Sequence, residues 1–417
     1  MAHQEIYQAA LKLHHQGKPT DLMAISNYLA DRGRLESVGG MAKLSQLLNR
    51  TVSAVNIDRY VDLIMDKYLR RKIIEAGNNI VNFGYDTTLE LETLLDCSQK
   101  EIFAISQQKI RSDTEHNSEI AAAVFNQLEK KTPLYSTGIK ELDRLMVGFE
   151  PGNMTILAGR PSMGKSAISL YLALHVAFQH QLPVVIFSLE MTKKQLEYRL
   201  WSLMSKLDCY KHLNLTPIKS DRLRQYQGSF CSLTEAEMNS IISIADLAAQ
   251  LPLYMNENRG ISVTNIASEC RKIQAREGKL GLVVVDYLQQ MVTTNSTDNR
   301  SYELGDVGRG LYQLAGELKV PILALSQVSR GVEGRNNKRP MMSDLSQSGI
   351  LEMVADNIIF AYRDEYYNQN TEKLGVLELI LAKARHGATG MAEVLFDKSS
   401  GLIRSFQEFA SVENSYS

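Results

Sequence analysis

The sequence predicts a small all-α domain followed by an α/β domain with a mostly parallel twisted sheet. Up to about residue 107, apolar residues recur with a helical period. From Ser136 onward, short runs rich in Val and Ile alternate with helical segments. Between them, the stretch QKIRSDTEHN is polar and has no apolar period. We therefore place the two domains at residues 1–107 and 136–417, joined by a linker at 108–135.

The first domain is predicted from three helical patterns. Ile6, Ala9, Ala10 and Leu13 recur at helical spacing, and Asp21 can cap a second helix. A long apolar stripe in AVNIDRYVDLIMDKYLRRKIIEAGNNIV predicts a further helix. Helices with such narrow apolar faces must pack on one another or on partners.

One amphipathic helix is predicted inside the linker, in SEIAAAVFNQLEKK. Ile120, Val124, Phe125 and Leu128 fall on one side, and no neighbouring helix in the sequence covers them. This helix packs either on its own domain or on a neighbouring subunit, and its residues alone leave both arrangements open.

The strands of the second domain are predicted from six short apolar runs. The runs are MTILA, VVIFSLE, LVVVDYL, PILALSQ, DNIIFAY and LELILAK. Runs of this length, separated by helix-like stretches, are typical of buried parallel strands joined by crossover helices.

The composition excludes several classes of protein. A net charge of -1 over 417 residues argues against a uniformly basic nucleic-acid-binding protein, so any contact with DNA or RNA must come from a local patch. No apolar run approaches the roughly 20 residues needed to span a membrane. The four cysteines lie far apart and lack the spacing of zinc ligands. We expect a cytoplasmic protein with reduced thiols and no membrane partner.

A phosphate-binding loop is predicted where MTILA is followed by G-x-x-x-x-G-K-S and then by the helical stretch SAISLYLALHVAF. In that context, backbone N–H groups and a helix N-terminus converge on oxyanions. Lys165 would supply charge for the β- and γ-phosphates, and Ser166 a hydroxyl for Mg²⁺. A glycine-rich surface turn would leave Lys165 unexplained. The expected nucleotide-binding residues of the loop are Gly159, Arg160, Pro161, Ser162, Met163, Gly164, Lys165 and Ser166.

Polar side chains at the ends of three further runs are candidates for the same site. Asp286, at the carboxyl end of VVVD, can supply the second metal ligand. Glu190, after VVIFSL, can polarise the attacking water or merely cap the next helix, and the sequence does not decide between these roles. Gln327, at the end of PILALSQ, can sense the γ-phosphate by hydrogen bonding.

These motifs occur in a chain that resembles the hexameric replicative DNA helicases of the DnaB family, whose core is a RecA-like P-loop ATPase. The matching stretches are, in order, GRPSMGKS, FSLEM, VVVDYLQ, ALSQVSR, RPMMSDL, FAYRDEYYN and KARHGATG. Near the N-terminus, KPTDLMAISNYLADRGRLESVGG and SAVNIDRYVDLIMDKYLRRKII resemble the helical domain with which that family meets primase.

The resemblance implies an ATP-driven helicase with ATP and Mg²⁺ as cofactors. It implies a homo-hexameric ring that moves 5′ to 3′ along single-stranded DNA and unwinds forked duplex, with primase and a helicase loader as partners. The place of action would be the cytoplasm, at the nucleoid, or the stroma if the protein belongs to a plastid.

The same resemblance assigns roles to individual residues. Glu190 becomes the catalytic base, Asp286 the Walker B carboxylate and Gln327 the γ-phosphate sensor. Lys383 and Arg385, in KARHG, match the basic pair that such rings insert into the neighbour's ATP site; without the resemblance we would interpret them as a solvated strand end. The resemblance also implies that Arg199 contacts the nucleotide base and that the linker helix holds the adjacent subunit.

One loop departs from the family pattern. After RPMMSDL, the family usually has Arg-Glu before Ser-Gly, whereas this chain has Ser-Gln, so a cation that neutralises a DNA phosphate is missing. A backbone N–H remains, and cations just upstream are possible substitutes unless they belong to an exposed, mobile loop. The expected DNA-binding residues are Arg335, Lys338, Arg339, Ser346, Gln347 and Gly349.

The N-terminus is a second departure, because relatives usually carry some tens of residues before the segment that begins here at Met1. We expect a shortened helical domain, or one that another chain completes. Two alternatives to the helicase stay open: a RecA-type binding ATPase or recombinase-like filament protein, and a non-motor paralogue that binds or regulates a replicative helicase.

Overall fold

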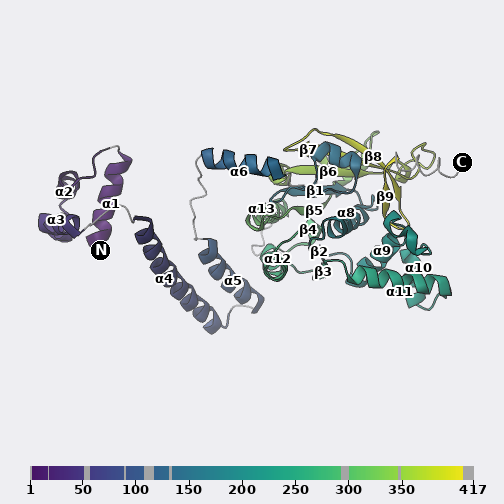
Figure 1. Ribbon diagram of the computed structural model, residues 1–417, viewed down its shortest axis with the longest axis horizontal. Helices are drawn as coiled ribbons and strands as arrows, with labels where there is room; N and C mark the ends of the chain where they lie inside the picture. Colours follow the sequence, from purple (N-terminus) through teal and green to yellow (C-terminus); the bar gives the residue numbers. More distant parts are fainter. Residues whose placement is uncertain are drawn as a thin grey trace. The chain divides into compact units, whose positions relative to one another are not determined.

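The computed structural model describes residues 2–16, 18–50, 57–88, 91–107, 117–130, 134–292, 300–345 and 349–406. The chain divides into two compact units, Met1–Arg111 and Ser112–Ser417 (Figure 1). In the part of the chain described, no helix is long and apolar enough to cross a membrane.

The first unit is built from helices, as the sequence predicts. Its α-helices are α1 (Ala2–His15), α2 (Leu22–Ala30), α3 (Gly40–Arg50), α4 (Ile57–Tyr85) and α5 (Leu91–Gln107), with a 3-10 turn at Glu36–Val38. Asp21 caps α2 by accepting a hydrogen bond of 2.8 Å from the Ala24 backbone N–H, which confirms the predicted helix start. A small core holds α1 to α3 together; its buried residues are Ala9, Leu29, Val38 and Leu44.

The second unit contains one nine-stranded sheet in the order β3-β2-β4-β5-β1-β6-β7-β8-β9. Its strands are β1 (Met154–Gly159), β2 (Val184–Ser188), β3 (Leu253–Asn256), β4 (Leu282–Asp286), β5 (Ile322–Gln327), β6 (Asn357–Tyr362), β7 (Val376–Ala384), β8 (Gly390–Asp397) and β9 (Leu402–Arg404). The six neighbouring strands β3-β2-β4-β5-β1-β6 are parallel to one another. The pairs β6-β7, β7-β8 and β8-β9 are antiparallel. The sheet is therefore mostly parallel.

One strand prediction was wrong in direction. The run LELILAK forms β7, which is antiparallel to β6. The connection from β6 to β7, residues 363–375, holds only a 3-10 turn at Asp364–Tyr366 and no crossover helix of the kind that usually joins a parallel pair. Strands β3, β8 and β9 were not predicted from the sequence.

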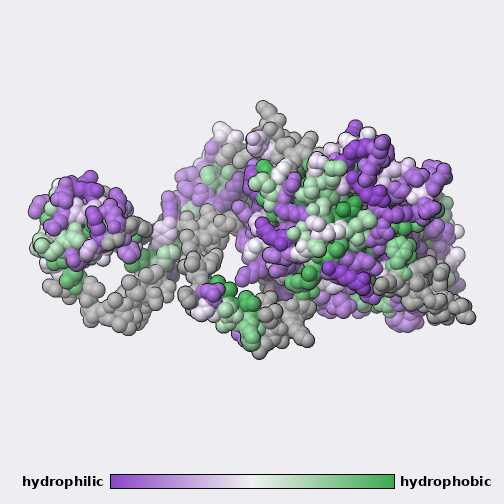
Figure 2. All heavy atoms as spheres, turned by 90° about the horizontal axis from the view of Figure 1, so that it is seen from above, coloured by the Kyte–Doolittle hydropathy of each residue, from purple (hydrophilic) through white to green (hydrophobic). Residues whose placement is uncertain are grey.

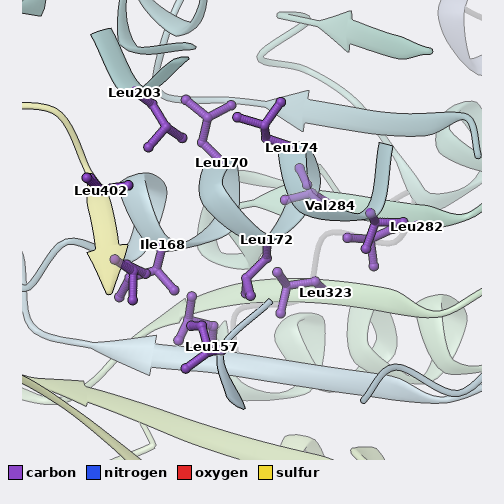
Figure 3. Close-up of a cluster of buried hydrophobic side chains, with 14 of the residues drawn as sticks. Leu157, Ile168, Leu170, Leu172, Leu174, Leu203, Leu282, Val284, Leu323 and Leu402 are labelled. Carbon is purple, nitrogen blue, oxygen red and sulfur yellow. The ribbon is translucent and has the colours of Figure 1, made fainter. Parts of the chain in front are cut away.

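Helices cover both faces of this sheet (Figure 1). Leu157, Val284 and Leu323 pack with α8 (Lys165–His180). Ile156 and Val283 belong to the core under α12 (Val263–Glu277), α13 (Arg300–Leu318) and α14 (Gly349–Val354). Figure 3 shows the first of these cores, in which the Leu and Ile side chains of α8 meet the sheet. The helices of this unit are α6 (Asn117–Lys130), α7 (Lys140–Met146), α8 (Lys165–His180), α9 (Lys193–Met204), α10 (Ser220–Gln227), α11 (Glu235–Ala249), α12 (Val263–Glu277), α13 (Arg300–Leu318) and α14 (Gly349–Val354).

The burial of β1 on both faces fixes the position of the loop that follows it. All six residues of β1 are buried, and the strand is hydrogen-bonded to β5 on one side and to β6 on the other. Helix α8, which begins after the loop, buries eight of its residues. The loop between them is therefore held at both ends by the core.

Helix α6 leaves its apolar residues exposed in the single chain. Ile120, Val124 and Phe125 are 43%, 49% and 63% exposed, and the side chain of Leu128 lies outside the described residues. Elsewhere on this unit, the face shown in Figure 2 gathers hydrophobic residues near its middle, among hydrophilic ones.

Candidate nucleotide-binding site

The carboxyl ends of four adjacent strands bring the predicted site residues to one edge of the sheet. The strands β2, β4, β5 and β1 are neighbours in that order. Gly159 at the end of β1 pairs with Gln327 at the end of β5, and Asp286 ends β4 beside Ser188 of β2. Glu190 follows two residues later. Ligands of open α/β sheets bind at this edge.

The loop from Gly159 to Ser166 has the backbone shape of a phosphate cradle. Gly164 has a φ of 95° and is the N-cap of α8, and a Cβ atom there would lie 3.0 Å from the Phe396 ring. Ser162 also has a positive φ, and its carbonyl accepts a hydrogen bond of 3.3 Å from Arg363. The side chain of Met163 is buried beneath the loop. Exposed N–H groups at the start of α8 would face an anion here.

The ammonium of Lys165 lies inside this cradle. It donates to the carbonyl oxygens of Gly159 at 2.8 Å and Arg160 at 3.1 Å. Burial lowers the pKa of Lys165 to about 8, although the charges of Asp286 and Glu190 oppose this shift. A partly desolvated cation bonded only to neutral carbonyls suits an incoming phosphate.

Asp286 and Ser166 offer oxygen atoms for a metal ion. The carboxyl of Asp286 is 4% exposed, and burial raises its pKa while a hydrogen bond with the Ser166 hydroxyl opposes that rise. Among the described residues, no group of three or more His, Cys, Asp or Glu side chains could hold a metal alone. Mg²⁺ fits such a site, because it is usually bound through one or two protein groups together with water and substrate phosphates.

Glu190 and Gln327 lie on either side of the strand that carries Asp286. Glu190 is exposed and lines a hollow together with Arg259, Gln289 and Gln290. Gln289 accepts from the Gln327 backbone N–H at 3.4 Å and donates to the Ser326 hydroxyl at 2.9 Å. Sequence reasoning did not single out Gln289, although it stands only three residues after Asp286.

Of two arginines of the predicted site, Arg160 has partners within the chain and Arg199 lies near the charges of the site. Arg160 forms an ion pair of 2.8 Å with Glu333 and donates to the Val328 carbonyl at 3.3 Å. Arg199 is partly buried; burial lowers its pKa, and the nearby charges of Asp286 and Glu190 oppose the shift. Arg199 therefore lies close to the two carboxylates. The partner of Arg160 was not predicted, because Glu333 lies 173 residues away in the sequence.

Lys383 and Arg385 lie at the opposite end of the parallel strands, on the side of the sheet where β1 begins. Near the end of β7, Ala384 pairs with Asn357, which in turn is level with Thr155 at the start of β1. The phosphate-binding loop follows the other end of β1, roughly 16 Å farther along the strand. This pair therefore cannot reach the phosphate-binding loop of its own chain.

Both cations are bound at that edge. Lys383 donates to the Glu352 and Met353 carbonyls at the end of α14, at 2.7 and 3.3 Å. Arg385 forms an ion pair of 2.6 Å with the buried carboxylate of Asp356. Both cations therefore have partners within the chain, while Arg385 remains exposed at this strand end.

Two of the cations expected to bind DNA are engaged in structural ion pairs. Arg335 pairs with Asp344. Arg339 forms a two-point contact with Glu378, at 2.6 and 2.7 Å, and that carboxylate is 1% exposed. Because each charge is already compensated, these two arginines are poor candidates for neutralising a DNA phosphate.

Of the other residues expected to bind DNA, Lys338 has no ion pair among the described residues. Lys338 donates to the Glu333 carbonyl at 3.1 Å and lies over the Tyr367 ring. Gly349 is the first residue of α14. Ser346 and Gln347 lie outside the described residues.

Two family models together match most of the chain. The model of the DnaB-like helicase C terminal domain matches residues 135–405, and that of the DnaB-like helicase N terminal domain matches residues 1–66. The chain belongs to the DnaB-like helicase family. This membership confirms the family and the fold class predicted from the sequence, implies nucleotide binding, and removes the recombinase-like alternative.

Several proteins described as replicative DNA helicases are similar to this DnaB-like chain. It is 34% identical to the replicative DNA helicase DnaC of Bacillus subtilis, an alignment that covers 100% of this chain and 88% of the relative. It is 45% identical to the replicative DNA helicase DnaB of Synechocystis, over 84% of this chain. That alignment covers 39% of the relative, so the chain spans about two fifths of the length of this cyanobacterial protein.

Two solved structures are similar to the DnaB-like chain. A DnaB-like replicative helicase, described with its interactions with primase, matches with a TM-score of 0.72 and 27% identity, over 96% of this chain and 91% of that one. The ATPase domain of G40P matches with a TM-score of 0.64 and 31% identity, over 70% of this chain and 100% of that one.

The lowered pKa of Lys165 predicts how nucleotide binding depends on pH. Above about pH 8 the free protein loses this proton, whereas bound phosphates favour the ammonium, so binding must then take up a proton. The affinity for ADP should be constant below about pH 8 and fall above it by at most about tenfold per pH unit. Equilibrium binding from about pH 7 to about pH 9.5 measures this effect. The Lys165→Ala variant is the control and should lack this dependence; an equal fall in both proteins would contradict the assignment.

Proposed function

We propose that this chain is an ATP-driven replicative DNA helicase. It assembles as a homo-hexameric ring, moves 5′ to 3′ along single-stranded DNA and unwinds duplex at the replication fork. The observation that carries the proposal is the division of the catalytic groups between two opposite edges of one sheet. A phosphate cradle with two carboxylates lies at one edge, and Lys383 with Arg385 lies at the other.

Each group at the first edge has a role in ATP hydrolysis. Lys165 and the N–H groups of the loop hold the β- and γ-phosphates, and Ser166 and Asp286 hold Mg²⁺. The metal, when bound, supplies positive charge to the phosphate oxygens. Glu190 accepts the proton of the attacking water, and Gln327, level with Gly159, hydrogen-bonds the γ-phosphate.

The cation pair completes the site of a neighbouring subunit. An arginine supplied by another chain stabilises the charge that develops on the transferred phosphoryl group. Because Arg385 cannot reach its own P-loop, each active site needs two chains. Head-to-tail contacts of this kind close into a ring when the rotation between subunits permits it.

The linker helix α6 gives the ring a second contact. Its exposed residues Ile120, Val124 and Phe125 form an apolar face that would be stabilised by packing on the adjacent subunit. Similarity to a replicative helicase whose structure is described with its primase interactions supports primase as a partner. A helicase loader remains a proposal from the family resemblance.

One observation favours a second function, that of a non-motor paralogue which binds or regulates a replicative helicase. The missing cation at Ser346 and Gln347 is not replaced by Arg335 or Arg339, whose charges are compensated by Asp344 and Glu378. DNA binding would then depend on Lys338 and on backbone N–H groups such as that of Gly349. This reduced set predicts a weak dependence of DNA affinity on salt.

Strand separation of a forked duplex with a 5′ tail, in ATP and Mg²⁺, tests the proposed function. The natural chain should unwind the fork, and Lys165→Ala should not, because it removes the cation that holds the β- and γ-phosphates. Lys272→Ala is the matched control, since Lys272 is an exposed lysine of α12 that pairs with Glu269. ATP hydrolysis without unwinding would favour the non-motor paralogue, and full unwinding by Lys165→Ala would contradict a P-loop motor.

A further inference from the structure

Asp356 is a buried carboxylate that joins the ends of three elements. It is fully buried and lies between α14 and β6. Its Oδ2 accepts a hydrogen bond of 2.8 Å from the backbone N–H of Met154, the first residue of β1. Its Oδ1 accepts one of 2.6 Å from Nη1 of Arg385, just beyond β7. A buried carboxylate with two such partners is stable in one orientation.

The backbone of the same residues is also paired. The Asp356 N–H donates to the Met154 carbonyl, and the Arg385 N–H donates to the Asp356 carbonyl, each at 2.9 Å. The three residues thus form a rigid junction at the edge of the sheet where β1 begins. A side chain attached to this junction has little freedom of position at its Cα atom.

Arg385 is held through one nitrogen of its guanidinium. Nη1 donates to Asp356 and also to the Tyr312 hydroxyl of α13, the latter at 3.1 Å. Nε and Nη2 have no hydrogen-bond partner among the residues that the structure describes. The side chain is 47% exposed. An arginine has five N–H groups, so this contact leaves donors for a second anion.

We propose that Asp356, together with the Tyr312 hydroxyl, is the positioning residue for Arg385. The carboxylate holds Nη1 and leaves Nε and Nη2 to donate to the phosphoryl group in the neighbouring subunit's site. This inference rests on the proposed function, in which Arg385 acts on the neighbour. Orientation of a catalytic group by a fixed hydrogen-bonding partner raises the fraction of time spent in the productive geometry.

A different role for the same contact makes the opposite prediction. If Asp356 held Arg385 in a position from which it does not reach the neighbour, weakening the contact would release the guanidinium and raise the rate of ATP turnover. Positioning predicts that weakening the contact lowers turnover while nucleotide affinity is unchanged. The sign of the effect therefore separates the two roles.

The experiment uses the full-length chain with the isosteric Asp356→Asn substitution. We expect kcat for ATP hydrolysis to fall on the order of 10²-fold, the cost of a small misplacement of a catalytic group. The Kd for ADP, the assembly mass and the melting temperature should be unchanged or nearly so. Tyr312→Phe removes one hydroxyl and should lower kcat less. Glu317→Gln, which breaks the exposed pair of α13 with Arg271, is the matched control and should have no effect.

A double-mutant cycle shows whether Asp356 acts through Arg385. Adding Asp356→Asn to Arg385→Ala should cause no further fall in kcat, whereas a structural role would lower kcat by the same factor in both backgrounds. If Asp356→Asn lowers the melting temperature or prevents assembly, Tyr312→Phe replaces it in the double-mutant cycle with Arg385→Ala. An unchanged or raised kcat in the single variants, with Arg385→Ala impaired, would overturn the positioning role. Full turnover by Arg385→Ala itself would instead overturn the proposed function.

Discussion

Arg385→Ala is expected to lower ATP turnover by roughly 10³- to 10⁵-fold, the range found for arginine fingers. Nucleotide binding to the same chain should stay intact, because Arg385 lies at the edge of the sheet opposite the P-loop. Steady-state hydrolysis gives kcat, and equilibrium binding of a fluorescent ADP analogue gives the affinity. The expected result is a large loss in the first with little change in the second.

The control for this variant is an arginine of similar exposure without a role at either edge. Arg271 of α12 pairs with Glu317 and is 36% exposed, so Arg271→Ala should keep normal turnover. Loss of ADP binding together with turnover in Arg385→Ala would point to a role in its own site or to misfolding. A melting curve distinguishes these two explanations.

Mixing two inactive variants should restore activity, which is the second large effect. Lys165→Ala should inactivate the nucleotide site of its own chain, and Arg385→Ala should inactivate the nucleotide site of the neighbouring chain. Where the nucleotide site of an Arg385→Ala chain meets the arginine of a Lys165→Ala chain, the shared site contains both an intact Lys165 and an intact Arg385. In an equal random mixture, about a quarter of the interfaces in a ring are of this kind. ATP hydrolysis should therefore rise from almost nothing to a substantial fraction of the natural rate.

The double variant, with both substitutions in one chain, is the control for mixing. Combined with either single variant, it can form no complete interface, so hydrolysis should stay near zero. Exchange of subunits is verified first, with a fluorescent label on each variant. If labelled subunits exchange and activity does not return, Lys165 and Arg385 do not act in one shared site.

The residues at the phosphate-binding edge could be predicted because parallel strands end on the same side. Once MTILA, VVIFS, VVVD and ILALSQ are interpreted as parallel strands, their following residues must converge. Glu190, Asp286 and Gln327 are therefore predictable as neighbours of Lys165, although 162 residues separate Lys165 from Gln327 in the sequence. The hydrogen-bonded register agrees with that expectation at Gly159 and Gln327.

The direction of β7 could not be predicted from its residues. LELILAK is as apolar as a parallel strand, and apolarity reports burial but not chain direction. What sets the direction relative to β6 is the connection between the two strands, residues 363–375, which contains no crossover helix. Because β7 runs antiparallel to β6, Arg385 lies at the opposite end of the strands from the P-loop, a position that the apolar pattern does not predict.

The partners of charged residues were also beyond prediction. In the sequence, Arg335 and Arg339 are two cations close together, as in a DNA-binding patch. Only the fold shows that Asp344 and Glu378 compensate their charges. Asp356 in the same way follows a short helix with no sequence signal that it meets Arg385, 29 residues later. Such pairs depend on packing between elements, which local sequence does not encode.

The opposite positions of the P-loop and Arg385 across one sheet have a consequence for inheritance. A mutation of Lys165 harms the product of the gene that carries it. In the proposed ring, a mutation of Arg385 would leave the nucleotide site of its own product complete and would remove the arginine from the site of the adjacent copy. In a cell with two versions of the gene, a substitution of Arg385 in one product would then impair ATP hydrolysis by the product of the other.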